Sequence, residues 1–221
     1  MCRFCGIVDF RKKIIDKSTL SRMNNSMSHG GPDNEGYFYN NSNNFNIGMA
    51  HRRLSIIDIS KAGNQPMVYN DHVIVFNGEI YNFKEIKSQL EKLNYEFKTN
   101  SDTEVILKAF FHWNLKCFEK FNGMFSIVIY IKNEDKLILA RDRIGVKPMF
   151  YYLKDGLFLF SSEIKAITMH NLFDGEINIS STPHFLSKGY INESSCIYKN
   201  VKKLQPSTIL ILNSDSSFKI T

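Results

Sequence analysis

The sequence predicts an α+β fold arranged in layers, and two features of the residue pattern support this prediction. Strand-like runs rich in β-branched and aromatic residues are numerous, and three or four amphipathic segments of helical periodicity lie between them. The strands and helices do not alternate regularly, as they would in a doubly wound parallel sheet. With 221 residues, the chain is long enough for one large domain with a sizeable buried core.

The first half of the chain is expected to contain strands and three helices. Alternation and helical spacing predict a strand at 4–10 and a helix at 18–27 capped by Ser18. They also predict strands at 35–40 and 45–50 joined by an Asn-rich turn, and a further strand at 51–59. Another strand is expected at 73–77, and it ends at Asn77-Gly78. An amphipathic helix follows at 83–93. Ser101 is expected to cap another helix that runs to about Trp113, with acidic residues in its first turn.

The second half is expected to be richer in strands. The pattern predicts strands at 124–131, 136–141, 149–152 and 157–161, short helices at 163–169 and 182–188, and a polar, β-like tail from about 196 to 221 with a turn at Gln205-Pro206.

Composition argues against several classes of function. The formal net charge is +6, but Lys and Arg are scattered without a basic block, so nucleic acid is not an expected partner. The sequence shows no secretory signal and no apolar run of about 18 residues, so we expect no membrane span. The cysteines at 2, 5, 117 and 196 lack zinc-site spacing. We therefore expect free thiols, no metal site and a cytoplasmic location.

Cys2 is the first candidate for chemistry. Cysteine is small enough for the initiator Met1 to be removed, which would leave Cys2 with a free α-amine next to its thiol. The amine titrates near pH 7.7–8.0 and can act as a base, while the thiol is the stronger nucleophile. One residue could then supply both nucleophile and base. The alternative is that Cys2 simply starts a buried strand.

Asn77 and Gly78 are candidates for an oxyanion site. A thiolate that attacks an amide creates a tetrahedral oxyanion, which needs two aimed donors. The Asn77 amide and the Gly78 N–H could supply them, because glycine allows close approach. Asn-Gly is also a common hairpin turn, which is the competing interpretation.

Three charged residues are candidates for holding an amino-acid substrate. Arg53 could bind an α-carboxylate through two hydrogen bonds, and Glu79 and Asp102 could face an α-ammonium group. Arg53 could equally be a surface arginine, and Asp102 a helix-capping acid. Together with Cys2, these residues fit one reaction, the hydrolysis of the side-chain amide of glutamine.

Six segments give the chain a family resemblance. They are Met1 to Gly6, His29-Gly30-Gly31-Pro32-Asp33, His51 to Asp58, Asn77-Gly78-Glu79-Ile80-Tyr81-Asn82, Ser101-Asp102-Thr103-Glu104, and Ala140 to Pro148 with the rest of the Arg141-to-Tyr152 stretch. In this order and spacing the sequence resembles the glutaminase domain of class II glutamine amidotransferases, which are N-terminal-nucleophile hydrolases. It most resembles the N-terminal half of glutamine-dependent asparagine synthetases.

The resemblance implies a four-layer α/β/β/α sandwich and a role for each candidate residue. It implies Cys2 as the nucleophile with its own amine as proton carrier, and Asn77 and Gly78 as the oxyanion hole. It implies Arg53 as the carboxylate ligand and Glu79 with Asp102 as the ammonium clamp. Ile56 and Ile57 would line the pocket through backbone contacts. The resemblance gives Cys5 only a structural role, and Asp142 and Gly145 are expected to serve the turn and its packing.

The sequence departs from the family pattern in two places. Arg3 occupies a position where a small residue is usual. Ser28 and Gly30 replace the two arginines of the family's Arg-His-Arg-Gly-Pro-Asp motif.

The resemblance also implies a larger protein. Residues 1–212 are expected to form the glutamine amidotransferase domain, and residues 213–221 the start of a linker to a C-terminal synthetase domain. The glutaminase step would use no cofactor, whereas ATP and Mg²⁺ would serve the synthetase domain. Expected partners are L-glutamine and that synthetase domain in cis, and a homodimer is a candidate assembly.

Two alternatives stay open at this point. The ammonia acceptor could be a sugar acid or another compound instead of aspartate. Alternatively, the chain could be a glutaminase-like regulatory module whose pocket has lost catalysis.

Overall fold

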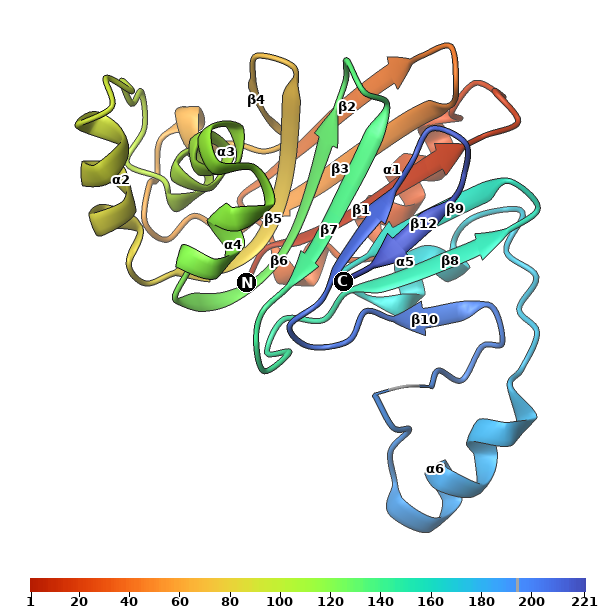
Figure 1. Cartoon of the computed structure of the whole chain (residues 1–221). Coiled ribbons are helices and arrows are strands. Elements are labelled where there is room, and N and C mark those ends of the chain that lie inside the picture. Colours follow the sequence, from red (N-terminus) through yellow and green to blue (C-terminus); the bar gives the residue numbers. More distant parts are fainter. Residues whose placement is uncertain (194) are drawn as a thin grey trace.

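The structure is a computed structural model that describes residues 1–193 and 195–221, and two antiparallel sheets dominate it (Figure 1). In this described part, sheet A has the strand order β10-β8-β9-β1-β3-β2, and sheet B has the order β12-β11-β7-β6-β5-β4. The strands of sheet A are β1 (Arg3–Asp9), β2 (Asn34–Asn41), β3 (Asn46–Arg53), β8 (Phe150–Lys154), β9 (Leu157–Ser161) and β10 (Val201–Lys203). Those of sheet B are β4 (Met67–Tyr69), β5 (His72–Ile80), β6 (Gly123–Ile131), β7 (Lys136–Arg141), β11 (Ile209–Leu212) and β12 (Phe218–Ile220).

Helices cover the outer faces of both sheets. The α-helices are α1 (Lys17–Asn25), α2 (Phe83–Glu91), α3 (Asp102–Trp113), α4 (Cys117–Lys120), α5 (Ile164–Thr168) and α6 (Thr182–Lys188). Short 3₁₀ turns are η1 (Ser28–Gly30), η2 (Lys61–Gly63), η3 (Asn114–Lys116) and η4 (Ile179–Ser181). Helices α1 and α5 pack on sheet A, and α3 packs on β4 and β5 of sheet B with α2 and α4 against it.

Three separate apolar cores among the described residues show that the molecule has four layers. Ile106 and Ile127 belong to a core between sheet B and its helices. Val75 and Phe160 belong to a core between the two sheets. Leu20 is part of a third core, between sheet A and α1. Three cores need four layers to enclose them, so the expected α/β/β/α sandwich is confirmed.

Strand alternation in β1 sets the direction of the two N-terminal cysteines. Phe4 and Val8 point into the core between the sheets, whereas Cys5 and Ile7 point toward α1. Cys2 precedes the strand and has the same parity as Phe4, so it belongs to the side that faces sheet B. This confirms the structural role expected for Cys5, which is fully buried.

Most predicted elements are confirmed, but three details were wrong. The strand expected at 51–59 ends at Arg53, and β5 does not end at Asn77 but continues to Ile80. Helix α1 is capped by Asp16, not by Ser18, because the Asp16 carboxylate accepts hydrogen bonds from two free backbone N–H groups of the first turn.

The C-terminal part completes sheet B. Strand β12 pairs antiparallel with β11, with Leu212 opposite Phe218. Residues 213–217 therefore form the connection of a hairpin. The linker expected to start at residue 213 stays a prediction.

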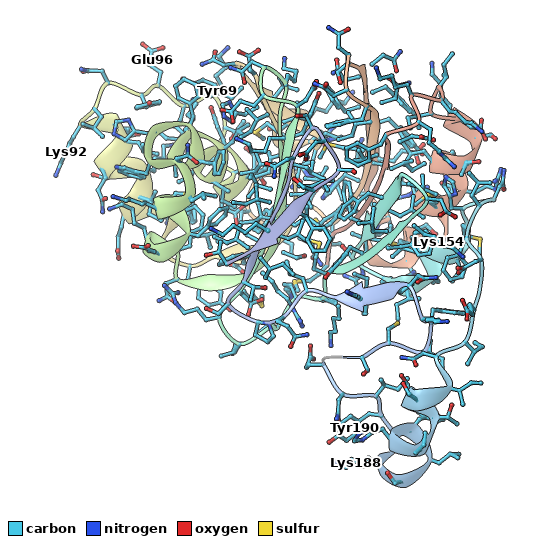
Figure 2. All side chains as sticks on the ribbon, turned by 45° about the vertical axis from the view of Figure 1, so that its right-hand side comes forward. Tyr69, Lys92, Glu96, Lys154, Lys188 and Tyr190 are labelled. Carbon is cyan, nitrogen blue, oxygen red and sulfur yellow. The ribbon has the colours of Figure 1, made fainter. Side chains whose placement is uncertain are left out.

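One segment projects from the layered body. Helix α6 and its flanking residues extend away from both sheets, with Lys188 and Tyr190 at the far end of the projection (Figures 1 and 2). Leu186 on this helix is 78% exposed. Within the described residues, no helix is long and apolar enough to cross a membrane.

Candidate active site

The candidate site lies where the inter-sheet core ends. Met49 of β3 and Val75 of β5 belong to that core. Because side chains alternate along a strand, Arg53 and Asn77 have the same direction as these two core residues. Arg3 lies opposite Arg52 in the β1–β3 register. One step further would put Cys2 opposite Arg53. The fold therefore gathers Cys2, Arg53 and Asn77 at one end of the space between the sheets.

An open pocket occupies this end of the molecule. Its volume is about 550 Å³ when the open solvent at its mouth is included. Seven of the predicted site residues line it, namely Cys2, Arg53, Ile56, Ile57, Gly78, Glu79 and Asp102. Asn77 is fully buried and is not among the lining residues, although its neighbours Phe76 and Gly78 are.

Cys2 sits at the edge of the pocket with its sulfur against the backbone of Leu54. The Leu54 N–H donates to Cys2 Sγ at 3.3 Å, and Sγ lies 3.5 Å from the Leu54 carbonyl oxygen. Burial raises the pKa of the Cys2 thiol, against the lowering effects of the Leu54 N–H, the N-terminal ammonium and Arg53. A buried thiol is held neutral, so it needs a nearby base in order to react.

Arg53 organises the loop that replaces the expected strand at 54–59. Its Nη1 donates to the Ser60 carbonyl oxygen and to Asn64 Oδ1, both at 2.6 Å, and its Nη2 donates to the Asp58 carbonyl oxygen. Within the described residues, two of its five N–H donors have no further partner, so they are available to a ligand. The loop curls around the buried guanidinium, and for this reason it does not continue the strand.

Gly78 lies in a part of β5 where the backbone of β6 comes very close. Its φ is +156°, and a Cβ on it would lie 2.1 Å from the Met124 carbonyl oxygen. Only glycine therefore fits this position. Next to it, the Nδ2 and Oδ1 atoms of Asn77 are buried and have no hydrogen-bond partner among the described residues. An unpaired buried amide costs about 1–3 kcal/mol, so the Asn77 amide is a candidate to pair with a ligand group.

Asp102 and Glu79 bring two carboxylates to one wall of the pocket. Ser101 caps α3, as predicted, and Asp102 is the first residue of that helix. The Ile80 N–H donates to Asp102 Oδ2 at 3.1 Å. Burial, with the nearby charge of Glu79, raises the pKa of Asp102 to about 6. A cation in the pocket would be attracted to this pair of acids.

His51 connects the two sheets beside the site. Its Nε2 lies 3.1 Å from the Phe76 carbonyl oxygen, across from β3 to β5. Burial lowers the pKa of His51 to about 3, so the ring is neutral at pH 7 and Nε2 carries the proton that it donates. The sequence interpretation gave His51 no role, because nothing in the pattern shows a contact between sheets.

Lys147 is a second residue that the sequence interpretation missed. Its Nζ lies 3.2 Å from Met1 Sδ, and burial, followed by the charge of Arg3, lowers the pKa of this ammonium.

Asp142 is fully buried and accepts hydrogen bonds from the backbone N–H groups of Phe125, Ile144, Val146 and Lys147. Gly145 has φ +70° in the same turn. The expected turn-and-packing role of Asp142 and Gly145 is thus confirmed, and this turn presents Lys147 to the N-terminus.

A family comparison agrees with this arrangement. A profile described as a glutamine amidotransferase domain matches residues 1–219. The chain belongs to the glutamine amidotransferase domain family. It is similar to a putative glutamine-hydrolysing asparagine synthetase 2 of Methanocaldococcus jannaschii, at 40% identity over 97% of this chain and 44% of that protein. It is also similar to glutamine-hydrolysing asparagine synthetase 1 of Bacillus subtilis, at 35% identity over 97% of this chain and 34% of that protein.

Solved structures support the fold of this amidotransferase domain. Glutamine phosphoribosylpyrophosphate amidotransferase of B. subtilis superposes with a TM-score of 0.68 at 16% identity, over 99% of this chain and 48% of that one. The amidotransferase domain spans less than half the length of these curated relatives.

Proposed function

We propose that this amidotransferase domain is the glutaminase part of a glutamine-dependent asparagine synthetase. The observation that carries the proposal is the shared pocket of Cys2, Gly78, Arg53 and Asp102. The printed names of the relatives, which are glutamine-hydrolysing asparagine synthetases, point to the same function. In this proposal the longer protein has aspartate as ammonia acceptor, and its synthetase domain uses ATP and Mg²⁺.

The reaction begins with removal of Met1, which lines the pocket next to Cys2. Its loss frees the α-amine of Cys2 and enlarges the pocket that Met1 lines. Glutamine then binds with its α-carboxylate on the two free N–H donors of Arg53. Its α-ammonium faces Glu79 and Asp102, and the backbone near Ile56 and Ile57 closes the side of the pocket.

The chemical step uses Cys2 alone as nucleophile and proton carrier. Sγ attacks the side-chain carbonyl carbon of glutamine while the thiol proton passes to the α-amine. Asn77 Nδ2 and the Gly78 N–H stabilise the oxyanion. The C–N bond breaks as the amine returns the proton, which releases ammonia and leaves a γ-glutamyl thioester. Water then attacks the thioester and yields glutamate. The step needs no metal or cofactor.

The proposal includes a cytoplasmic location. The four cysteines are free thiols, and such thiols persist in a reducing compartment.

A glutamate-release assay on protein of confirmed N-terminal mass tests the proposal. We expect hydrolysis of glutamine by the form that starts at Cys2, and loss of about 10³-fold or more in Cys2→Ala, which removes the nucleophile. Cys5→Ala is the matched control, since that thiol is buried on the opposite face of β1. Unchanged hydrolysis in Cys2→Ala would remove Cys2 from the mechanism. Ammonia transfer to aspartate has to be measured with the longer protein.

A further inference from the structure

The two departures from the family pattern meet in space. A Cβ on Gly30 would lie 2.6 Å from Arg3 Cγ and 3.2 Å from Arg3 Nε. The stem of Arg3 therefore fills the space into which a side chain at position 30 would begin. An arginine at 30, as in the motif that this sequence resembles, could not coexist with Arg3 without rearrangement. The unusual arginine at 3 and the unusual glycine at 30 form a matched pair.

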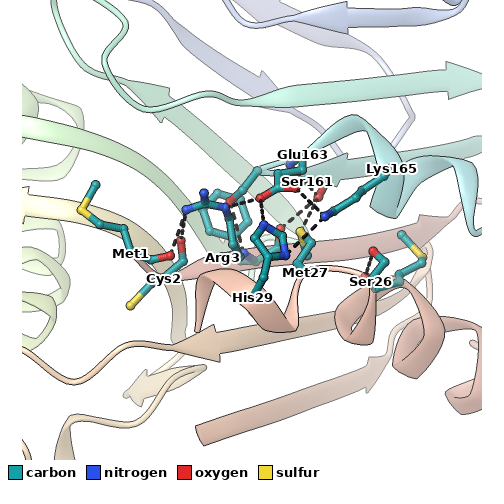
Figure 3. A network of polar contacts seen from close by, with 12 residues as sticks. Met1, Cys2, Arg3, Ser26, Met27, His29, Ser161, Glu163 and Lys165 are labelled. Atoms are coloured by element: carbon teal, nitrogen blue, oxygen red, sulfur yellow. Dashed lines mark hydrogen bonds and ion pairs between the residues drawn. The ribbon is translucent and has the colours of Figure 1, made fainter. Parts of the chain in front are cut away.

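Arg3 uses this position to hold the backbone of the nucleophile. Its Nη1 donates to the Met1 carbonyl oxygen at 2.9 Å and to the Cys2 carbonyl oxygen at 3.0 Å (Figure 3). When Met1 is removed, the bond to Cys2 is the one that remains. A guanidinium on this carbonyl fixes the residue whose thiol and amine both have to be aimed.

An ion pair with Glu163 fixes the Arg3 guanidinium itself. Its Nε donates to Glu163 Oε1 at 2.5 Å. The same carboxylate contacts His29 Nε2 at 3.0 Å and Lys165 Nζ at 3.1 Å. Although burial opposes it, the hydrogen bonds from Arg3 and Lys165 lower the pKa of Glu163, so the anion is kept. Figure 3 shows Arg3 between this cluster and the carbonyl oxygens of Met1 and Cys2.

We propose that Arg3 is a positioning residue of the glutaminase reaction. It holds the Cys2 carbonyl from its anchor on Glu163, and its stem occupies the space that a side chain at position 30 would enter. This inference rests on the proposed function.

The position of Arg3 also affects the base. The Met1 carbonyl oxygen and the Cys2 nitrogen belong to one peptide unit and are about 2.2 Å apart. Because Arg3 Nη1 lies 2.9 Å from that oxygen, it lies within about 5 Å of the Cys2 nitrogen. A cation at that distance favours the neutral form of an amine. Lys147 contacts Met1, Arg53 acts on the Cys2 thiol, and Asp142 and Glu79 act on Lys147. These charged groups are the same in every variant proposed below.

The test compares Arg3→Ala, Arg3→Lys, Gly30→Arg and the double variant Arg3→Ala/Gly30→Arg in the glutamate-release assay. For Arg3→Ala we expect kcat/KM to fall about tenfold to a hundredfold. We also expect the acid limb of its pH profile to move up by about one pH unit, since the amine loses its neighbouring cation. Arg3→Lys should restore most of the profile. Gly30→Arg alone should lose activity through collision with Arg3, and the double variant should exceed both single variants.

Controls separate positioning from folding and from the proposed function. Arg52→Met removes a cation from the paired strand position, where the side chain contacts Glu35, and should stay within about twofold of wild type. Thermal unfolding and N-terminal mass are recorded for each variant. If Arg3→Ala retained the kcat/KM and the pH profile of wild type, the positioning role of Arg3 would be overturned. A double variant no better than Arg3→Ala would overturn the exchange of positions. A wild-type domain without glutaminase activity would instead contradict the proposed function.

Discussion

Asp102 is buried beside Glu79 at the start of α3, and burial raises the pKa of its carboxyl to about 6. Only the ionised form attracts the α-ammonium of glutamine. We therefore predict that KM falls as pH rises through about 6 and is nearly constant above pH 7. In Asp102→Asn this pH dependence should vanish, and kcat/KM at pH 8 should fall about 10- to 100-fold. Steady-state kinetics between pH 5 and 8 check both effects.

The same carboxyl gives a stability readout that does not depend on activity. Its pKa is higher in the folded state than the ordinary value of 3.8. The folded state thus binds the proton more tightly, and this stabilisation is lost as pH rises from about 4 to about 6. At pH 8, Asp102→Asn should then have a free energy of unfolding higher than that of wild type, by at most about 3 kcal/mol. It should therefore unfold at a higher denaturant concentration. A less stable variant at pH 8 would contradict this account of Asp102.

Arg53 is the residue that should control glutamine affinity. We predict that Arg53→Lys keeps the charge but loses the two-pronged geometry, so KM rises about 30- to 150-fold, or 2–3 kcal/mol. Because Arg53 also holds the loop through Asp58 and Ser60, a small thiol reagent provides the control. Alkylation of Cys2 by iodoacetamide needs no contact with the glutamine carboxylate. Its rate in Arg53→Lys should therefore differ from the wild-type rate by less than about threefold. Unchanged KM would mean that another residue binds the carboxylate.

At the scale of elements, the site depends on the close approach of β5 and β6 at Gly78. An alanine there would place its Cβ 2.1 Å from the Met124 carbonyl oxygen. We predict that Gly78→Ala lowers the free energy of unfolding by about 1–3 kcal/mol and abolishes glutamate release. Gly189→Ala is the matched control: Gly189 has φ +74°, and no atom of the residues that the structure describes lies within 4 Å of an added Cβ. It should cost about 1 kcal/mol or less and keep activity. Equal destabilisation by the two variants would assign the effect to backbone conformation alone.

The sequence predicts element types well where one period continues unbroken, as in β6, β7 and α3. It fails where a side-chain contact or the pairing of strands decides the backbone. Leu54, Ile56 and Asp58 alternate as in a strand, but the carbonyl groups at 58 and 60 turn toward Arg53. At Asn77-Gly78 the turn-like pair lies inside β5, because β6 pairs with it on one side.

The candidate site could be predicted from local motifs only in part. Cys2, Arg53 and Asp102 carry their chemistry in the residue type and in the family resemblance. His51 and Lys147 lie in segments of the family resemblance, but the resemblance does not show their contacts, and it does not show that Arg3 meets Gly30. Their roles arise from strands and turns that are far apart in the sequence, so only the folded structure reveals them.

At the scale of the whole molecule, stability should come from the three cores and not from the projecting α6. This helix has no buried residue, and Phe185 and Leu186 are 51% and 78% exposed. We predict that Phe185→Ser/Leu186→Ser changes the free energy of unfolding by less than about 0.5 kcal/mol. Ile106→Ala, in the core under sheet B, should cost about 2–5 kcal/mol. Chemical denaturation measures both, and a large loss in the α6 variant would show that the projection is part of the cooperative fold.

The most direct measurement is the rate at which a diazo-ketone analogue of glutamine labels the protein, followed by intact mass and peptide mapping. Two forms are compared, one that starts at Cys2 and one that retains Met1. We predict one label per chain, on Cys2, in the first form, and labelling about 100-fold slower or absent in the second, whose Cys2 nitrogen is part of a peptide bond and cannot act as a base. Equal rates in the two forms, or a label on Cys5, would contradict the claim that Cys2 reacts with the help of its own amine.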